Sequence, residues 1–224
     1  MKKNKIFVAC DTTNISKIKK IIEATRTNKI HLIPKFGLQF FYSKNGRSFL
    51  SKIKDREIFL DLKLNDIPQT CKAALFSLKD LKNIRYITVH INSGQEVIKQ
   101  VKLFSKKINK KVKILGVTVL TSFSNSALKK IGYTKNLNQV VLNQVKLAKK
   151  CNLDGIVTSG DEIIKVKKIC KNMEIVVPGI RFKGGKKHDQ KRVIDPIEAF
   201  SKGATSIVMG RSLTEGNLKN NFRK

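Results

Sequence analysis

The chain has 224 residues, 41% of them hydrophobic, and carries a formal net charge of +31. This composition can bury a sizeable core, which argues against disorder, and its apolar runs are too short to span a bilayer. The charge invites a nucleic-acid interpretation, but of the 47 basic residues 39 are lysines spread along the chain and only 8 are arginines. Since base readout and stacking favour arginine and aromatic residues, we interpret most of the charge as solvated surface that also attracts anionic substrates.

The first residues and the cysteines indicate the compartment. Met1-Lys2-Lys3-Asn4-Lys5 resembles the charged start of a signal peptide, but the apolar stretch after it ends at Asp11 after about six residues, too few for secretion. The four cysteines form no C-x-x-C pair and are expected to be buried free thiols: Cys10, Cys71, Cys151 and Cys170. The three histidines are scattered. We therefore expect a cytoplasmic protein without a metal site.

Short β-branched runs alternate with amphipathic helical segments along the whole chain. The predicted strands are Lys5–Cys10, His31–Lys35, Glu57–Leu62, Tyr86–His90, Val112–Leu120, Gly155–Thr158, Glu174–Pro178 and Ser206–Met209. The predicted helices are Ile15–Ala24, with Asn14 as its N-cap, Pro68–Leu78, Gln95–Ile108, Leu137–Lys150 and Glu162–Cys170. Eight β/α units in one chain predict a (β/α)₈ TIM barrel, a single domain over residues 1–224. An open doubly wound sheet is the structural alternative.

Charged residues at the end of the third predicted strand suggest catalysis. Side chains alternate along a strand, so Asp61 and Lys63 should point together into the barrel mouth, where active sites of such barrels lie. Lys35 ends the neighbouring strand, and Asp66 follows closely in the sequence. A structural salt bridge would explain an isolated pair, but alternating charges in a desolvated pocket create a preorganised field and allow a lysine to donate a proton.

Two later segments suggest a phosphate site. Pro178-Gly179-Ile180-Arg181 follows the seventh predicted strand and Gly210-Arg211-Ser212 follows the eighth. Barrels often bind phosphate between these two loops, and Ser212 is placed to cap the next helix. Ordinary turns with surface arginines are the alternative. Gln190 lies in the intervening loop Lys183–Lys191, which could close over a ligand.

Taken together, these segments resemble the orotidine 5′-phosphate decarboxylase family. The most specific match is the tract Phe59-Leu60-Asp61-Leu62-Lys63-Leu64-Asn65-Asp66-Ile67-Pro68-Gln69-Thr70. Further matches, in family order, are Val8–Asp11, Pro34–Gly37, Thr88–His90, Val117–Ser122, Leu153–Gly155, Pro178–Arg181, Asp189-Gln190 and Gly210-Arg211.

The resemblance implies a cofactor-free decarboxylation of orotidine 5′-monophosphate to uridine 5′-monophosphate, the last step of UMP synthesis. It implies a tetrad in which Asp61 faces the substrate carboxylate, Lys63 protonates C6, Lys35 completes the array, and Asp66 comes from the other subunit of a homodimer. The implied substrate-binding residues are Asp11 and Lys35 (ribose), Thr70 from the partner, Thr121 and Ser122 (pyrimidine), Gln190, Gly210 and Arg211 (phosphate), Pro178, and Arg181 on the closing loop.

The chain departs from the family pattern at Phe36, Ser212 and the Ile91-Asn92-Ser93-Gly94 segment, and His188 precedes Asp189-Gln190. Two alternatives remain. A Mg²⁺-dependent sugar-phosphate decarboxylase or aldolase-like relative needs a carboxylate at the second strand end, where Lys35 stands. A basic nucleic-acid-binding protein on an inactive barrel would be expected to have lost these functional residues, and they are intact. We expect no membrane and no specific nucleic-acid partner.

Overall fold

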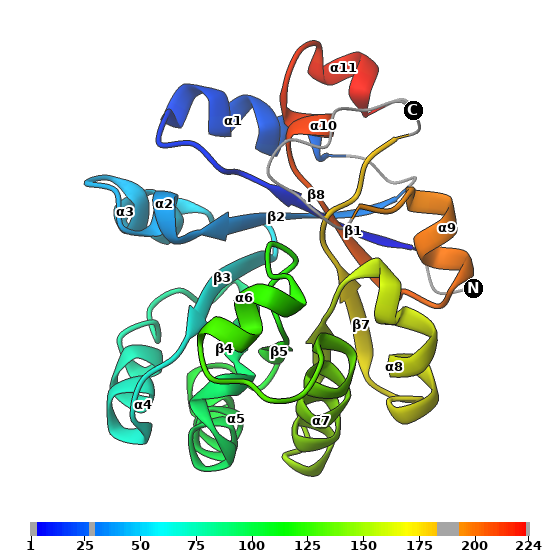
Figure 1. Ribbon diagram of the computed structural model, residues 1–224. Helices are drawn as coiled ribbons and strands as arrows, with labels where there is room; N and C mark the ends of the chain where they lie inside the picture. The colour runs from blue at the N-terminus through cyan, green and yellow to red at the C-terminus, as the bar shows by residue number, and fades with distance from the viewer. Residues whose placement is uncertain (1–3, 27–29, 183–192, 223–224) are drawn as a thin grey trace.

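The computed structural model describes residues 4–26, 30–182 and 193–222, and in it eight parallel strands close into a barrel in sequence order. The strands are β1 (Lys5–Ala9), β2 (His31–Gly37), β3 (Ile58–Leu64), β4 (Ile84–His90), β5 (Lys113–Val117), β6 (Gly155–Val157), β7 (Glu174–Val177) and β8 (Ser206–Met209). Helices surround the strands (Figure 1). The predicted (β/α)₈ barrel is confirmed, and the open doubly wound sheet is wrong.

The outer layer is made of helices and short 3-10 turns. They are α1 (Ile15–Ala24), α2 (Leu38–Phe41), α3 (Gly46–Lys52), α4 (Pro68–Phe76), η1 (Ile91–Ser93), α5 (Gln95–Ile108), α6 (Asn125–Lys130), α7 (Leu137–Lys150), η2 (Gly160–Glu162), α8 (Ile163–Ile169), α9 (Pro196–Ser201), α10 (Arg211–Thr214) and α11 (Leu218–Asn221). The bounds of α1, α5 and α7 match the prediction. The Asn14 side chain accepts the backbone N–H of Lys17 at 3.0 Å, which confirms the predicted N-cap.

The fifth strand is shorter than predicted. It ends at Val117 and not at Leu120, although the β-branched and apolar pattern continues through Thr118, Val119 and Leu120. Val119 is buried and lines a cavity at the carboxyl ends of the strands. Its apolar side chain therefore belongs to the cavity wall, which the sequence pattern cannot distinguish from a strand.

The middle of the barrel interior is apolar. Inward-pointing side chains pack there into one cluster, in which Phe7 meets Phe59 edge-on at 4.7 Å between ring centroids and Tyr86 at 4.9 Å. Leu115 and Val176 complete the layer from the opposite strands. Because this layer fills the barrel, polar groups gather separately at its two ends.

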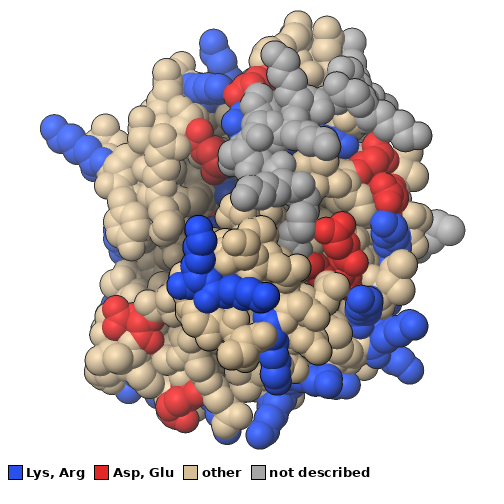
Figure 2. Space-filling view, viewed as in Figure 1, with Lys and Arg blue, Asp and Glu red and all other residues tan. Residues whose placement is uncertain are grey.

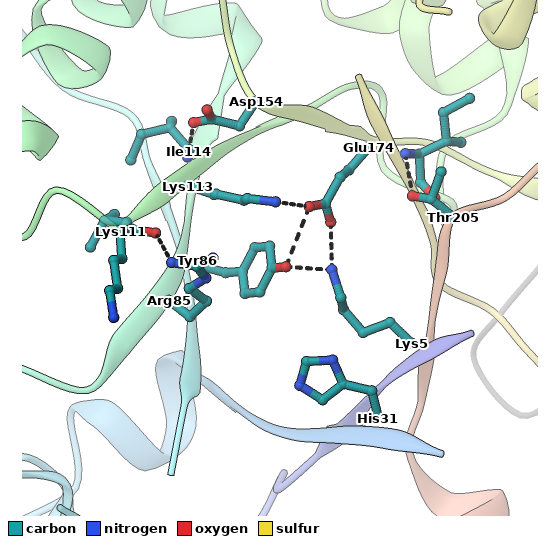
Figure 3. A network of polar contacts seen from close by, with 12 residues as sticks. Lys5, His31, Arg85, Tyr86, Lys111, Lys113, Ile114, Asp154, Glu174 and Thr205 are labelled. Atoms are coloured by element: carbon teal, nitrogen blue, oxygen red, sulfur yellow. Dashed lines mark hydrogen bonds and ion pairs between the residues drawn. The ribbon is translucent and has the colours of Figure 1, made fainter. Parts of the chain in front are cut away.

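At the amino ends of the strands, the Glu174 carboxylate is the centre of a polar cluster (Figure 3). Lys5 Nζ lies 2.9 Å from Glu174 Oε2, Lys113 pairs with Oε1, and the Tyr86 hydroxyl is 3.4 Å from Oε1. Burial alone would raise the pKa of the Glu174 carboxyl, but Lys113 and Lys5 hold it below its ordinary value. Each of these groups uses another member of the cluster as its partner.

The surface and the cysteines agree with the expectations. Cys10, Cys71, Cys151 and Cys170 are buried free thiols. Basic side chains are scattered over the face shown in Figure 2, with acidic ones between them. Within the described ranges, no helix is both long enough and apolar enough to cross a membrane.

Candidate active site

A cavity of about 740 Å³ opens at the carboxyl ends of the strands. Its walls include most of the residues predicted from the sequence, namely Asp11, Lys35, Asp61, Lys63, Thr121, Ser122, Pro178, Arg181, Gly210 and Arg211. A second cavity of about 600 Å³ lies outside the barrel beside α1 and α3 and contains none of them. The polar cavity at the strand ends is therefore the candidate site.

Three side chains from β2 and β3 form an ion-paired array on the cavity wall. Lys63 Nζ lies 3.0 Å and Lys35 Nζ 3.3 Å from Asp61 Oδ2, and Lys35 Nζ is also 3.4 Å from Asp11 Oδ1. The parallel register of β2 and β3 pairs Lys35 with Phe59 and Gly37 with Asp61. The Lys35 side chain therefore starts two residues before Asp61 on the neighbouring strand and lies beside the Asp61 carboxylate. Lys35 is only 6% exposed, whereas the Lys63 side chain keeps 33% of its surface accessible.

Burial and pairing oppose each other in this array. Burial would raise the pKa of the Asp61 carboxyl, but Lys35 and Lys63, with hydrogen bonds from Lys63 and Thr88, hold it below its ordinary value. Burial would lower the pKa of Lys35, but Asp61 and Asp11 hold it above its ordinary value. Asp61 and Lys35 therefore both stay charged at neutral pH in a desolvated wall.

Thr88 on β4 is part of this array, although its role was not predicted. Its Oγ1 lies 3.0 Å from Asp61 Oδ1 and accepts the backbone N–H of Lys63 at 2.8 Å. Lys63 has a φ of +48°, at a point where the pairing of β3 with β4 changes register. The sequence put Thr88 in the family-like segment Thr88–His90 and, two residues after Tyr86, on the inward face of the same strand, but it gave Thr88 no role.

The loops after β7 and β8 form another wall of the cavity. Gly179 has a φ of +76°, which a glycine accepts without strain, and Arg181 follows it at the cavity. Arg211 is the first residue of α10, preceded by Gly210. The expectation that Ser212 caps this helix is wrong, because Gly210 occupies the N-cap position and Ser212 lies inside the helix. Gln190 and the loop Lys183–Lys191 lie outside the described residues.

Asp66 and Thr70 are not part of this cavity. Both are exposed at the start of α4, and Asp66 Oδ1 accepts the backbone N–H of Ile67 at 2.7 Å. Ile67 itself is 65% exposed.

His90, which ends β4, has its pKa lowered by burial and by Lys63, and its Nδ1 accepts the backbone N–H of Asn92.

Several wall residues carried no sequence signal of their own. They are Thr12, Lys17, Thr158, Thr214 and Glu215. Within the described residues, no group of three or more His, Cys, Asp or Glu side chains is arranged to hold a metal ion.

Comparisons with known proteins agree over nearly the whole chain. The model of the "Orotidine 5′-phosphate decarboxylase / HUMPS family" matches residues 4–221. The orotidine 5′-phosphate decarboxylase of Wigglesworthia glossinidia brevipalpis is 39% identical over 222 residues, which cover 97% of this chain and 93% of that one. The enzyme of the same name from a Wolbachia pipientis strain is 37% identical over 217 residues, 96% of this chain and 93% of its own.

Solved structures show the same fold. The crystal structure of orotidine 5′-phosphate decarboxylase from Lactobacillus acidophilus superimposes with a TM-score of 0.84 at 29% identity, covering 98% of this chain and 96% of that one. That of the Methanocaldococcus jannaschii enzyme, complexed with the inhibitor BMP, has a TM-score of 0.76 at 22% identity, covering 99% and 96%.

Proposed function

The chain belongs to the orotidine 5′-phosphate decarboxylase / HUMPS family, and on that premise we propose that it decarboxylates orotidine 5′-monophosphate to uridine 5′-monophosphate without a cofactor. Its relatives are named as decarboxylases, which makes the chain a carboxy-lyase. The finer proposal concerns the residues that carry the reaction and the subunits from which they come.

The observation that carries the proposal is the Asp61 carboxylate held between two lysines on a cavity wall. The substrate carboxylate binds beside Asp61, and the repulsion between these two anions favours its departure. The bond between the carboxylate and C6 breaks, CO₂ leaves, and the electron pair stays on C6. Lys63, 3.0 Å from Asp61 and still partly accessible, supplies the proton to C6.

Binding of the rest of the nucleotide follows from the other walls. Arg181, Gly210 and Arg211 are assigned to the phosphate, with Pro178 shaping the loop. Thr121 and Ser122 are assigned to the pyrimidine, and Asp11 with Lys35 to the ribose hydroxyls. Gln190 is assigned to the phosphate from the sequence resemblance alone. Phosphate binding far from C6 would hold the substrate carboxylate against Asp61.

We assign Asp66 and Thr70 to the neighbouring site of a homodimer. Both are exposed at the start of α4 and outside their own cavity, and the adjacent Ile67 leaves an apolar side chain 65% exposed. An exposed isoleucine beside functional polar residues fits a surface that a second subunit covers.

The alternatives have weaker support. A Mg²⁺ ion at this end of the barrel would meet Lys35, whose ammonium lies 3.3 Å from the Asp61 carboxylate and repels a cation. A nucleic-acid surface would gather its charge in one patch, whereas on the face in Figure 2 basic groups are dispersed among acidic ones.

The direct test is a spectrophotometric assay with orotidine 5′-monophosphate in excess EDTA. We expect full turnover in EDTA and no change on adding Mg²⁺. Activity that is absent in EDTA and restored by Mg²⁺ would support the metal-dependent relative. Salt-sensitive DNA binding without any turnover would support the nucleic-acid-binding alternative.

The shared site can be tested with mixed dimers. A Lys63→Ala chain and an Asp66→Ala chain should each be inactive, but a heterodimer contains one site with both residues intact. We expect the mixture to regain activity, up to about one quarter of wild type if subunits exchange at random. A mixture as inactive as its parents, although exchange is shown by native mass spectrometry, would contradict the assignment of Asp66.

A further inference from the structure

The Thr88 side chain joins the two reactive residues of the array. Thr88 is fully buried on β4, and its hydroxyl contacts the Asp61 carboxylate at 3.0 Å and the Lys63 backbone N–H at 2.8 Å. It is absent from the residues that line the cavity. Any influence of Thr88 on the reaction is therefore exerted through Asp61 and Lys63.

The direction of these hydrogen bonds is fixed by chemistry. A backbone N–H can only donate, so the Thr88 oxygen accepts from Lys63. The single hydroxyl hydrogen is then available for Asp61, whose carboxylate can only accept while it is ionised. The chain of bonds runs from the Lys63 backbone through Thr88 to Asp61 Oδ1. Because the two lysines both approach Oδ2, Thr88 holds the opposite oxygen and fixes the plane of the carboxylate.

The backbone around Lys63 explains why a hydroxyl is needed there. The pairing of β3 with β4 shifts register between Leu60 and Leu64, and Lys63 has a φ of +48° in the left-handed region. Thr88 supplies the acceptor for the Lys63 N–H at this irregularity, where a buried donor without a partner would be costly. A non-glycine residue in this conformation persists only when its surroundings hold it.

We infer that Thr88 is a positioning residue, which orients the Asp61 carboxylate and holds the Lys63 backbone in the conformation that aims its ammonium at C6. This inference rests on the proposed function and adds a residue to it. The hydroxyl should affect the chemical step more than substrate binding, because it touches the charged array and not the cavity.

The test compares Thr88→Val, which replaces the hydroxyl with a methyl group of similar size, with Thr88→Ser, which keeps the hydroxyl. We expect Thr88→Val to lower kcat about 10- to 100-fold, as for a lost hydrogen bond to a charged group, and to change KM less than about threefold. Thr88→Ser should keep kcat within about threefold of wild type. If Thr88→Val does not fold, Thr88→Cys, with a weak donor of similar size, takes its place with the same expectation.

Thr118→Val is the matched control. Thr118 is 1% exposed, and its hydroxyl bonds to the Val157 carbonyl at 2.9 Å, which also accepts the Thr118 backbone N–H. This substitution therefore removes a buried hydroxyl just beyond the end of the neighbouring strand β5 without leaving that carbonyl unpaired, and kcat should not change. A Thr88→Val enzyme with kcat within twofold of wild type, or a Thr88→Ser enzyme as slow as Thr88→Val, would overturn the inference.

A second readout is independent of turnover. A ¹³C NMR titration of the Asp61 carboxyl should give a higher pKa in Thr88→Val than in wild type, because a donor to the ionised form is lost, and Thr88→Ser should restore it. An unchanged Asp61 pKa in Thr88→Val would overturn the role of Thr88, whether or not the wild-type chain acts on orotidine 5′-monophosphate. A wild-type chain without activity on orotidine 5′-monophosphate would overturn the proposed function.

Discussion

The two ends of the barrel carry nearly the same set of groups. At the carboxyl ends of the strands, Asp61 lies between Lys35 and Lys63 and meets the hydroxyl of Thr88. At the amino ends, Glu174 lies between Lys5 and Lys113 and meets the hydroxyl of Tyr86 (Figure 3). In both cases one carboxylate is held by two lysines and by a hydroxyl from β4.

The two arrays differ in what surrounds them. Lys5 and Lys113 lie over the Tyr86 ring at 4.9 and 5.8 Å from its centroid, so both lysines at the amino ends contact the ring as well as the carboxylate of their own cluster. Lys63 instead borders a cavity of about 740 Å³ whose walls also carry Arg181 and Arg211. A carboxylate between lysines is thus no site by itself, and the open cavity with arginines on the loops after β7 and β8 makes the difference.

The largest difference between the two ends is expected when one lysine is removed from each. Lys63 and Lys113 are matched, since both side chains are 33% exposed and both pair with a carboxylate. We expect Lys63→Ala to lower kcat at least ~10²- to 10⁴-fold, as for a lost general acid, while the protein stays folded. Lys113→Ala should keep kcat and lose about 1 kcal/mol of unfolding free energy. Steady-state kinetics and urea titrations measure both, and a Lys63→Ala enzyme with more than a few per cent of wild-type kcat contradicts the assignment.

The carboxylate at the amino ends of the strands should be visible in the pH dependence of stability. The pKa of the Glu174 carboxyl is held below its ordinary 4.5 by Lys113 and Lys5 against the effect of burial. Its contribution to stability is therefore complete above pH 4.5 and is lost as the pH falls through the depressed value. Urea unfolding between pH 7 and about pH 3 should give a shallower pH dependence in Glu174→Gln than in wild type. Equal slopes in the two proteins would show that Glu174 is not the stabilising carboxylate.

The smallest expected effect comes from the hydroxyl of Tyr86 on β4. Tyr86→Phe removes the hydroxyl that lies 2.5 Å from Lys5 and 3.4 Å from Glu174 but keeps the ring in the apolar layer. We expect a loss of about 1 kcal/mol in unfolding free energy and no change in kcat, the opposite of Thr88→Val. Differential scanning calorimetry with parallel kinetics checks this, and a loss of kcat in folded Tyr86→Phe would mean that the two ends are coupled.

The sequence predicted the site better than its supporting contacts. Alternation along β3 was enough to place Asp61 and Lys63 on one face, and the structure brings both to the cavity. The left-handed φ of Lys63 and the register shift beside it were invisible, because they depend on how β3 meets β4. The role of Thr88 was therefore found only in the structure.

The cluster at the amino ends could not have been predicted for a related reason. Its members, Lys5, Tyr86, Lys113 and Glu174, come from four strands, and nothing local marks which of 39 lysines meet one glutamate. Val119 shows the converse error, since an apolar run extended the predicted fifth strand into the cavity wall. The closure of the barrel determines both which side chains meet around Glu174 and where β5 ends, and local sequence patterns do not encode that closure.

The most direct test of the account is to neutralise the two central carboxylates in turn. Asp61→Asn and Glu174→Gln are compared in the orotidine 5′-monophosphate assay at pH 7, after circular dichroism has shown that each is folded at the assay temperature. We predict that Asp61→Asn loses at least ~100-fold in kcat, because the charge that destabilises the bound carboxylate and pairs with Lys63 is gone. Glu174→Gln should stay within about twofold of wild type. A folded Glu174→Gln enzyme as slow as Asp61→Asn, or an Asp61→Asn enzyme with near wild-type kcat, would contradict the account.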